Sequence, residues 1–147
     1  MASVSAAPTE TGGPVLSVLD RAECLVLLTT QPYGRVVLTH RALPVVLPVN
    51  FVLVGTGVLL RVRPGSVLSG AIRGVVVAFQ ADRVDPAAQT GWSVMVVGRA
   101  EEVIDPELRQ RVLAQLVPWA EGQRDHVVRI RAEQVTGRRL LQAPVTG

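Results

Sequence analysis

Apolar positions along the chain alternate with polar ones in short runs, and glycine, proline or aspartate separates the runs. Alternation with a period of two is typical of strands with one face toward a core, because successive side chains point to opposite faces of a sheet. The pattern predicts six strands, over residues 33–40, 43–54, 57–62, 74–85, 91–105 and 126–140.

Three other segments show helical spacing. Residues 16–28 have apolar side chains at helical intervals, and their last turns are apolar on nearly every side, so the rest of the fold is expected to cover this helix. Residues 64–74 are predicted to form a short helix with Ser66 as its N-cap, and residues 105–116 a third helix capped by Asp105. Few helices and turn-joined strands together predict a mainly β fold, an antiparallel barrel with helices on its outside and ends.

Glycine and proline residues within residues 43–62 indicate where the strands turn and where their hydrogen bonding is interrupted. Gly55 and Gly57 are suited to the turn of a hairpin between strands 43–54 and 57–62. Pro44 and Pro48 lie inside the first of these strands, and proline cannot donate a hydrogen bond to a sheet. One side of this strand is therefore predicted to be an edge, a bulge or an opening.

The length of 147 residues predicts one domain. We expect this domain over residues 15–141, after a disordered leader over residues 1–14 and before a loose tail over residues 142–147. Hydrophobic residues make up 48% of the chain, which is compatible with apolar surface hidden at a subunit interface.

Composition and charge argue against several classes of function. All 15 basic residues are arginines scattered along the chain, the net charge is +3 and aromatic residues make up only 3%, so a nucleic-acid interface is not expected. No apolar run is long enough to span a membrane, and the first residues lack the pattern of a signal peptide. The single cysteine, Cys24, cannot form an internal disulfide. A cytoplasmic protein without a membrane partner is expected.

Arg61 and Arg63 alternate along one predicted strand and should project from the same face of it. The Pro-Gly-Ser corner that follows opens the predicted helix 64–74. Backbone N–H groups at a helix start and arginine side chains both attract anions. These arginines and Ser66 are therefore a candidate phosphate site, although a solvated strand end before a capped helix would show the same pattern.

Other reactive side chains have plain structural interpretations. His40 and His126 are isolated and lack the spacing of metal ligands, so no metal site is predicted. Cys24 lies on the helix expected to be buried and is interpreted as a core thiol. Asp82 and Asp85 are interpreted as turn-forming residues. No catalytic residue is assigned.

Between residues 16 and 140 the order of motifs resembles that of the pyridoxamine 5′-phosphate oxidase-like flavoproteins, and most closely their small single-domain actinobacterial branch. The motifs are Leu-Pro-Val-Asn-Phe at 47–51, Gly-Ser at 65–66, Gly-Trp-Ser-Val at 91–94 and Gly-Arg-Arg at 137–139. The resemblance implies a six-stranded antiparallel split β-barrel that forms a homodimer and holds flavin mononucleotide (FMN) in two clefts between the subunits.

The resemblance also implies an FMN-dependent oxidoreductase acting on an unknown small molecule. The flavin would carry the redox chemistry while the protein binds and orients it. Asn50 offers a donor and an acceptor to the polar edge of the ring, while Arg61, Arg63 and Ser66 would hold the phosphate. The candidate cofactor-binding residues are Pro48, Val49, Asn50, Arg61, Val62, Arg63, Ser66, Val67, Trp92 and Ser93.

One departure from the family pattern keeps alternatives open. Related proteins often have a lysine directly after the Gly-Ser pair, where this chain has Val67. The alternatives are a reductase that uses the deazaflavin F420 in the same cleft, or a non-catalytic barrel that binds a ligand or a partner and has lost its flavin.

Overall fold

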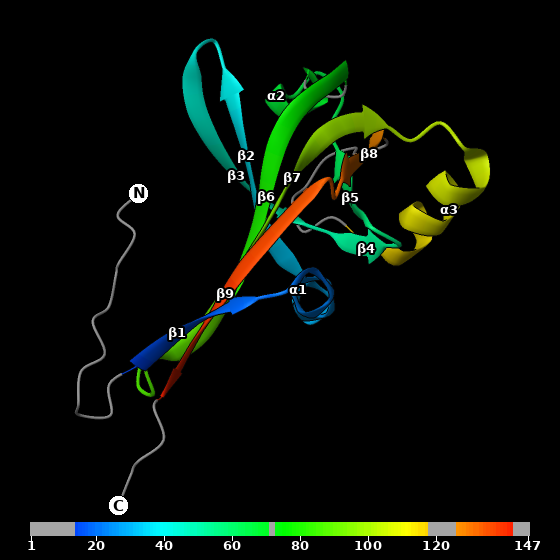
Figure 1. Ribbon diagram of the computed structural model, residues 1–147. Coiled ribbons are helices and arrows are strands. Elements are labelled where there is room, and N and C mark those ends of the chain that lie inside the picture. The colour runs from blue at the N-terminus through cyan, green and yellow to red at the C-terminus, as the bar shows by residue number, and fades with distance from the viewer. Residues whose placement is uncertain (1–13, 71–72, 118–125, 143–147) are drawn as a thin grey trace, which may run out of the picture.

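The computed structural model describes residues 14–70, 73–117 and 126–142. The first strand begins at Pro14 and the last ends at Gln142, each one residue beyond the limits predicted for the domain, and the rest of the predicted leader and tail lies outside the described residues. The described residues form nine strands and three helices (Figure 1): β1 Pro14–Leu19, α1 Arg21–Leu28, β2 Tyr33–His40, β3 Leu43–Asn50, β4 Val52–Val54, β5 Gly57–Val62, α2 Val67–Gly70, β6 Arg73–Asp85, β7 Thr90–Glu102, α3 Pro106–Gln115, β8 His126–Arg131 and β9 Gln134–Gln142.

The strands form one curled antiparallel sheet with the order β3-β2-β6-β7-β8-β5-β4, and β9 pairs with both β7 and β1. The predicted class, a mainly β antiparallel split barrel, is confirmed. β3 is an edge strand, as its prolines indicated. The predicted count of six strands is wrong, because two of the expected strands are each divided in two and a further strand precedes the first helix.

Both divided strands break where the chain changes its pairing partner. Residues 43–54 are not one strand: β3 pairs with β2, β4 pairs with β5, and Phe51 between them is buried. The predicted hairpin is therefore only the short β4–β5 pair, which turns through Gly55 at φ +59°. Residues 126–140 break at Ala132 and Glu133, so that β8 can pair with β5 while β9 pairs with β1.

The predicted helix over residues 16–28 is wrong in its first half. β1 pairs with β9, with Leu16 opposite Leu140, and α1 begins only after Asp20. The Asp20 carboxylate accepts a hydrogen bond from the Glu23 N–H at 2.8 Å, and the Glu23 carboxylate accepts one from the Asp20 N–H at 3.1 Å. Because this capping box fixes the start of a helix, the apolar residues before it are free to pair as a strand.

The other two predicted helices are present, one of them much shortened. α2 is a single turn in which the Ser66 hydroxyl accepts from the Ser69 N–H at 3.2 Å. α3 matches its prediction and is capped by Asp105, whose carboxylate accepts from the Leu108 N–H at 3.3 Å. No helix in the described part of the chain is long and apolar enough to cross a membrane.

The core lies inside the curl of the sheet. Phe51 and Phe79 meet there with their ring centroids 4.6 Å apart, and α1 contributes Cys24 and Leu28. A second, smaller core lies on the opposite side of β5 and β8, where α3 covers them. Since side chains alternate along a strand, Val58, Leu60 and Val62 enter the barrel core while Leu59 faces α3. The second core consists of Leu59, Val103, Val112, Leu116 and Val127.

β7 is the strand on which the two parts of the sheet meet. Its residues up to Val97 pair with β9, and its residues from Ala100 onward pair with β8. Gly98 lies at this change of partner, where the carbonyl oxygen of Arg131 approaches so closely that a Cβ would overlap it. Because residue 98 has no side chain, the backbone of β8 can approach β7 closely at the point where β9 ends its pairing with β7.

Candidate functional site

The ten predicted cofactor-binding residues fall on four segments that lie in different parts of the sheet. The end of β3 meets the end of β5 at the end of α3, and it shares the outer surface of the sheet with the start of β7. The segments are the end of β3 with Pro48, Val49 and Asn50, the end of β5 with Arg61 and Val62, the following corner with Arg63, Ser66 and Val67, and the start of β7 with Trp92 and Ser93.

Asn50 and Arg61 are brought together by the C-terminal end of α3. The Asn50 side-chain amide donates to the carbonyl of Val117 at 2.6 Å, and the Arg61 guanidinium donates to the carbonyl of Leu116 at 3.0 Å. Carbonyl groups at the end of a helix carry partial negative charge, and α3 has no basic residue in its own last turn. Arg61 therefore supplies the positive charge that complements this helix end.

Of the two arginines expected on one strand face, Arg61 alone lies within a strand. β5 ends at Val62, so Arg63 lies beyond the ladder and is exposed, whereas Arg61 is half-buried. Val62 is buried, with its side chain in the barrel core. Val67 is half-buried and packs against that core. Of these four predicted residues, Arg63 is therefore the one whose side chain is most open to a ligand.

Pro48 and Ser93 lie on the outer surface of the sheet, where Ser93 belongs to a polar network that the sequence pattern did not predict. The Arg35 guanidinium donates to Gln80 at 3.1 Å and to Asp82 at 3.0 Å, and the Gln80 amide donates to the Ser93 hydroxyl at 3.0 Å. Strand pairing places Pro48 directly beside Arg35. The network thus runs across β2, β6 and β7 beside the proline of β3.

Asp82 belongs to this network, so its interpretation as a turn residue is wrong. It lies within β6 and forms an ion pair with Arg35. Asp85 does form the turn, because its carboxylate accepts from the N–H groups of Ala87 and Ala88 at 3.1 and 3.2 Å. The even-numbered polar positions 80 and 82 share one face of the strand, a period-two signal that could have indicated the network.

Trp92 and Val49 point the other way. Both are half-buried and pack against the barrel core, whereas Ser93 is exposed. In this chain Trp92 therefore contributes to the inner side of the sheet, and Ser93 is the residue of the Gly-Trp-Ser-Val motif that faces outward.

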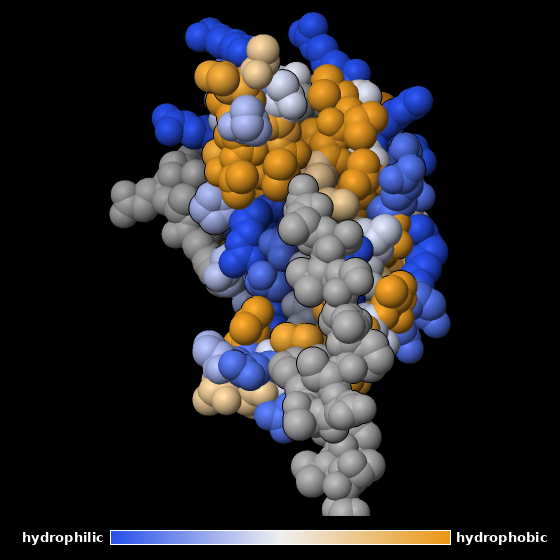
Figure 2. Space-filling view, turned by 60° about the vertical axis from the view of Figure 1, so that its left-hand side comes forward, coloured by the Kyte–Doolittle hydropathy of each residue, from blue (hydrophilic) through white to orange (hydrophobic). Residues whose placement is uncertain are grey.

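Apolar side chains surround the polar network on the outer surface of the sheet. Figure 2, which brings forward the side of the molecule that carries β2 and β3, shows a broad hydrophobic area beside hydrophilic side chains. We call the large apolar residues that point outward from the strands around the network the outer sheet face. Its members are Val18, 80% exposed, Val46, 59%, Val76, 56%, Val84, 65%, and Met95, 42%.

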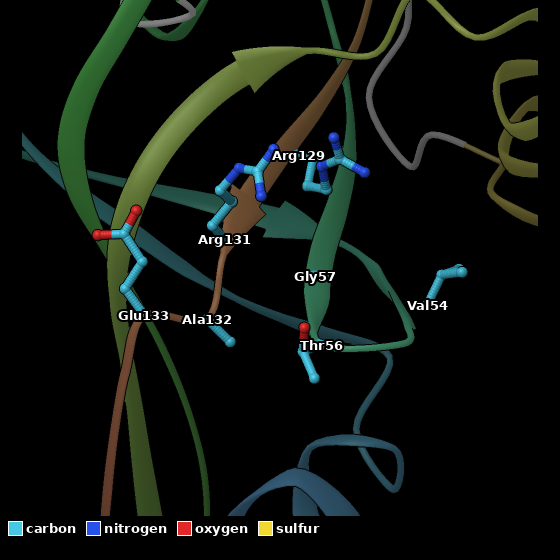
Figure 3. A pocket seen from close by; sticks show the side chains of 7 residues that line it. All are labelled: Val54, Thr56, Gly57, Arg129, Arg131, Ala132 and Glu133. Carbon is cyan, nitrogen blue, oxygen red and sulfur yellow. The ribbon is translucent and has the colours of Figure 1, made fainter.

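A half-open depression of about 370 Å³ lies elsewhere, at the start of β5 (Figure 3). None of the ten predicted residues lines it. Beside it, the Glu101 carboxylate forms ion pairs with Arg129 at 2.9 Å and with Arg131 at 2.7 Å. The lining residues are Val54, Thr56, Gly57, Arg129, Arg131, Ala132 and Glu133.

The titratable groups show one perturbed acid and one perturbed thiol. Burial of the Glu101 carboxyl would by itself raise its pKa, but the hydrogen bonds and charges of Arg129 and Arg131 outweigh it and hold the pKa below its ordinary value. Burial, with a smaller contribution from neighbouring acids, raises the pKa of the Cys24 thiol. The interpretation of Cys24 as a core thiol is confirmed. The described residues contain no cluster of three or more histidine, cysteine, aspartate or glutamate side chains suited to a metal ion.

Comparisons with known proteins agree on the family and extend over most of the chain. Residues 20–139 match the family model described as pyridoxamine 5′-phosphate oxidase. The uncharacterized protein Rv0080 of Mycobacterium tuberculosis is 46% identical over 128 residues, which is 84% of this chain and 84% of that protein.

Solved structures are similar over the same part of the chain. The FAD binding protein from Mycobacterium smegmatis is 33% identical, with a TM-score of 0.68 over 85% of this chain and 98% of its own. The FAD-binding protein from Mesorhizobium loti is 26% identical, with a TM-score of 0.76 over 88% of this chain and 100% of its own.

Proposed function

Because the chain belongs to the pyridoxamine 5′-phosphate oxidase family, we propose that it binds a flavin nucleotide, FMN in the first instance, and acts with it as an oxidoreductase on a small molecule. The observation that carries the proposal is the similarity to two FAD-binding proteins over nearly their whole length. FMN and FAD share the ring and the phosphate next to the ribityl chain, so one flavin site can be considered for both.

The corner after β5 is the proposed position of that phosphate. Arg63 is exposed there and Arg61 lies two residues before it, which provides positive charge on both sides of Val62. α2 is only one turn long, and its cap Ser66 already accepts from Ser69, so the helix start adds little and the arginines are the main attraction for an anion.

The outer sheet face is the proposed contact with a second copy of the chain. Its apolar side chains are 42–80% exposed, and no described element covers them. Contiguous apolar surface of this kind is typical of protein interfaces. The network of Arg35, Gln80, Asp82 and Ser93 lies within it, and we propose that the flavin ring binds at the border of this interface, near Pro48 and Ser93.

In this arrangement the chain binds and orients while the flavin, when bound, supplies hydride or electron transfer. Cys24, buried and with a raised pKa, is not suited to act as a nucleophile. A free buried thiol is also compatible with the reducing cytoplasm, which we include in the proposal.

A second function is favoured by the contacts at the end of α3. Asn50 and Arg61 both donate to backbone carbonyls there, and Val67 stands in place of a cation. A non-catalytic barrel that binds a different ligand would account for these contacts, and F420 is a third possible occupant of the same cleft.

The test is to identify the bound cofactor. Protein purified without added ligand is expected to show the visible absorption of a flavin and to release FMN or FAD on denaturation, identified by mass spectrometry. Separate additions of FMN, FAD and F420 should raise the melting temperature only for a ligand that binds the folded state. Colourless protein stabilised by neither FMN nor FAD would contradict the flavin proposal, and stabilisation by F420 alone would support the deazaflavin alternative.

A further inference from the structure

The depression at the start of β5 has a positive wall built from two neighbouring strands. Arg129 and Arg131 project from the same face of β8, and a single oxygen of Glu101 accepts from both. These are the Arg129 Nε and Nη2 groups, at 3.2 and 2.9 Å, and the Arg131 Nε group, at 2.7 Å. One carboxylate therefore holds two guanidinium groups, so one of the two positive charges is not balanced by Glu101.

The outer amino groups of these arginines are available for a ligand. Arg129 Nη1 and both Nη groups of Arg131 make no hydrogen bond to any described residue. Figure 3 shows the Thr56 hydroxyl pointing toward the arginines, and the Glu133 carboxylate beside Arg131, on the side away from Thr56. Within the described residues Glu133 forms no ion pair with Arg129 or Arg131. Arg21 adds a third guanidinium nearby, which donates to the Ala132 carbonyl at 2.7 Å.

This depression is separate from the corner proposed for the flavin phosphate. Gly57 and Arg61 lie on the same face of β5, but Leu59 between them is covered by α3, together with Val127 of β8. The packed helix therefore stands between the two regions on this face. An anion at the depression would therefore not require a bound flavin.

We propose that this depression binds the phosphate group of a small molecule, held by the outer guanidinium nitrogens of Arg129 and Arg131 and by the Thr56 hydroxyl. Three amino groups and a hydroxyl at separate positions need several acceptor oxygens, which a tetrahedral phosphate has and a planar carboxylate lacks. Glu101 is a positioning residue that fixes both guanidinium groups. The volume of about 370 Å³ leaves room for a small organic group attached to the phosphate.

The experiment is an NMR titration of the full chain with inorganic phosphate, compared with acetate at equal ionic strength. Phosphate is expected to shift the backbone amide signals of Thr56, Gly57 and Ala132 in a saturable manner, and acetate much less. Shifts confined to Gly65 and Ser66 would place the phosphate at the corner after β5 and overturn the proposal, as would equal responses to the two anions.

Variants separate a binding role of the arginines from a structural one. Arg131 is 54% exposed, so Arg131→Gln should fold, and it is expected to weaken phosphate binding about five- to tenfold because a charge-assisted hydrogen bond is lost at a partly screened site. Arg41→Gln, which removes one positive charge from the β2–β3 turn, is the control and should leave the affinity unchanged. If the two variants weaken binding equally, phosphate responds only to net charge and the site is refuted. Thr56→Val offers a second probe, expected to weaken binding two- to threefold without touching the ion pairs.

Discussion

Gly98 shows how a single residue can determine the shape of the whole sheet. β7 changes its partner from β9 to β8 around this position, and the close carbonyl of Arg131 leaves no space for even a methyl group. That carbonyl belongs to the backbone of β8, so it cannot move away as the tip of a flexible side chain could. The bend that separates β8 from β9 therefore depends on glycine at this position.

We expect Gly98→Ala to lower the free energy of unfolding by about 3 kcal/mol or more, because the new Cβ would overlap backbone. The matched control is Gly70→Ala at the end of α2, where a Cβ would meet no atom within 4 Å. That change should be neutral or stabilising by up to about 1 kcal/mol, since alanine favours helix. Urea unfolding followed by circular dichroism measures both variants, and similar stabilities for the two would contradict the close contact at Gly98.

Glu101 makes the stability of the chain depend on pH. Its pKa is held below the ordinary value in the folded state, so its contribution to stability is complete above the pKa of the unfolded chain and is lost as the pH falls through the folded pKa. Glu101→Gln should therefore be less stable than wild type near neutral pH, and the difference should shrink below about pH 4. Melting temperatures from about pH 7 to pH 3 test this, with Glu107→Gln on α3 as the control. A difference between wild type and Glu101→Gln that stays constant over that range would show that the ion pairs contribute little.

Among the elements, the β2–β3 hairpin contains a local strain that a substitution can remove. His40 pairs with Leu43, so the turn consists of Arg41 and Ala42 alone, at φ +51° and +64°. A two-residue turn with both φ values positive favours Asn-Gly, because side chains with a Cβ are strained in this conformation. The hairpin keeps this turn because the long β2–β3 pairing on either side of it offsets the strain.

Ala42→Gly is expected to raise the free energy of unfolding by up to about 1 kcal/mol through relief of that strain. The same substitution in α3, Ala114→Gly, should instead lower it by a fraction of a kcal/mol, because glycine disfavours helix. Chemical denaturation measures the free energy of unfolding of each variant, and the two changes relative to wild type should have opposite signs. If Ala42→Gly lowers the free energy of unfolding, the greater conformational entropy that glycine gives the unfolded chain outweighs the strain removed from the turn.

The sequence pattern predicts elements well where local signals are enough. β2 was predicted with its observed limits, and α3 is marked by its cap Asp105 and by Pro106. The breaks at Phe51 and Ala132 could not be predicted, because no glycine or proline marks either break and only the partner strand changes. β1 was predicted as helix because residues 16–28 satisfy helical spacing, and its true pairing is with a strand more than 100 residues away.

The same limit applies to the candidate site. The sequence could name Ser93 and Pro48, but their connection through Arg35, Gln80 and Asp82 depends on the register of β2, β6 and β7. The hydrogen bond from the Arg61 guanidinium to the Leu116 carbonyl at the end of α3 is likewise a contact between residues far apart in the sequence. Residue types can thus suggest a site, whereas the partners of each side chain follow from the pairing of distant strands.

For the whole molecule, the outer sheet face carries the proposal of a homodimer. If two copies meet there through a twofold axis, each substitution acts twice in the interface. Val46→Asp would bury two unpaired carboxylates, at a cost of several kcal/mol. The chain is therefore expected to sediment as a dimer, and Val46→Asp as a monomer at micromolar concentration.

Ile104→Asp is the matched control for this experiment. Ile104 is 83% exposed on the loop before α3, outside the outer sheet face, so its substitution should leave the dimer intact. Analytical ultracentrifugation distinguishes the cases. A wild-type monomer at micromolar concentration would contradict the dimer, and dissociation by both variants would indicate that the second copy docks elsewhere.

The exchange of partners along β7 also has a consequence for the time course of folding. β2–β3, β4–β5, β6–β7 and β7–β8 join consecutive strands, while β1–β9, β2–β6, β5–β8 and β7–β9 bring together strands that are separated by other strands in the sequence. Such topologies fold in milliseconds to seconds, because loop entropy is lost before distant contacts compensate. During that interval β3 exposes an unpaired edge, on which Pro44 and Pro48 cannot donate hydrogen bonds to a neighbouring chain. The same prolines that mark an edge in the native sheet would thus limit aggregation before the barrel closes.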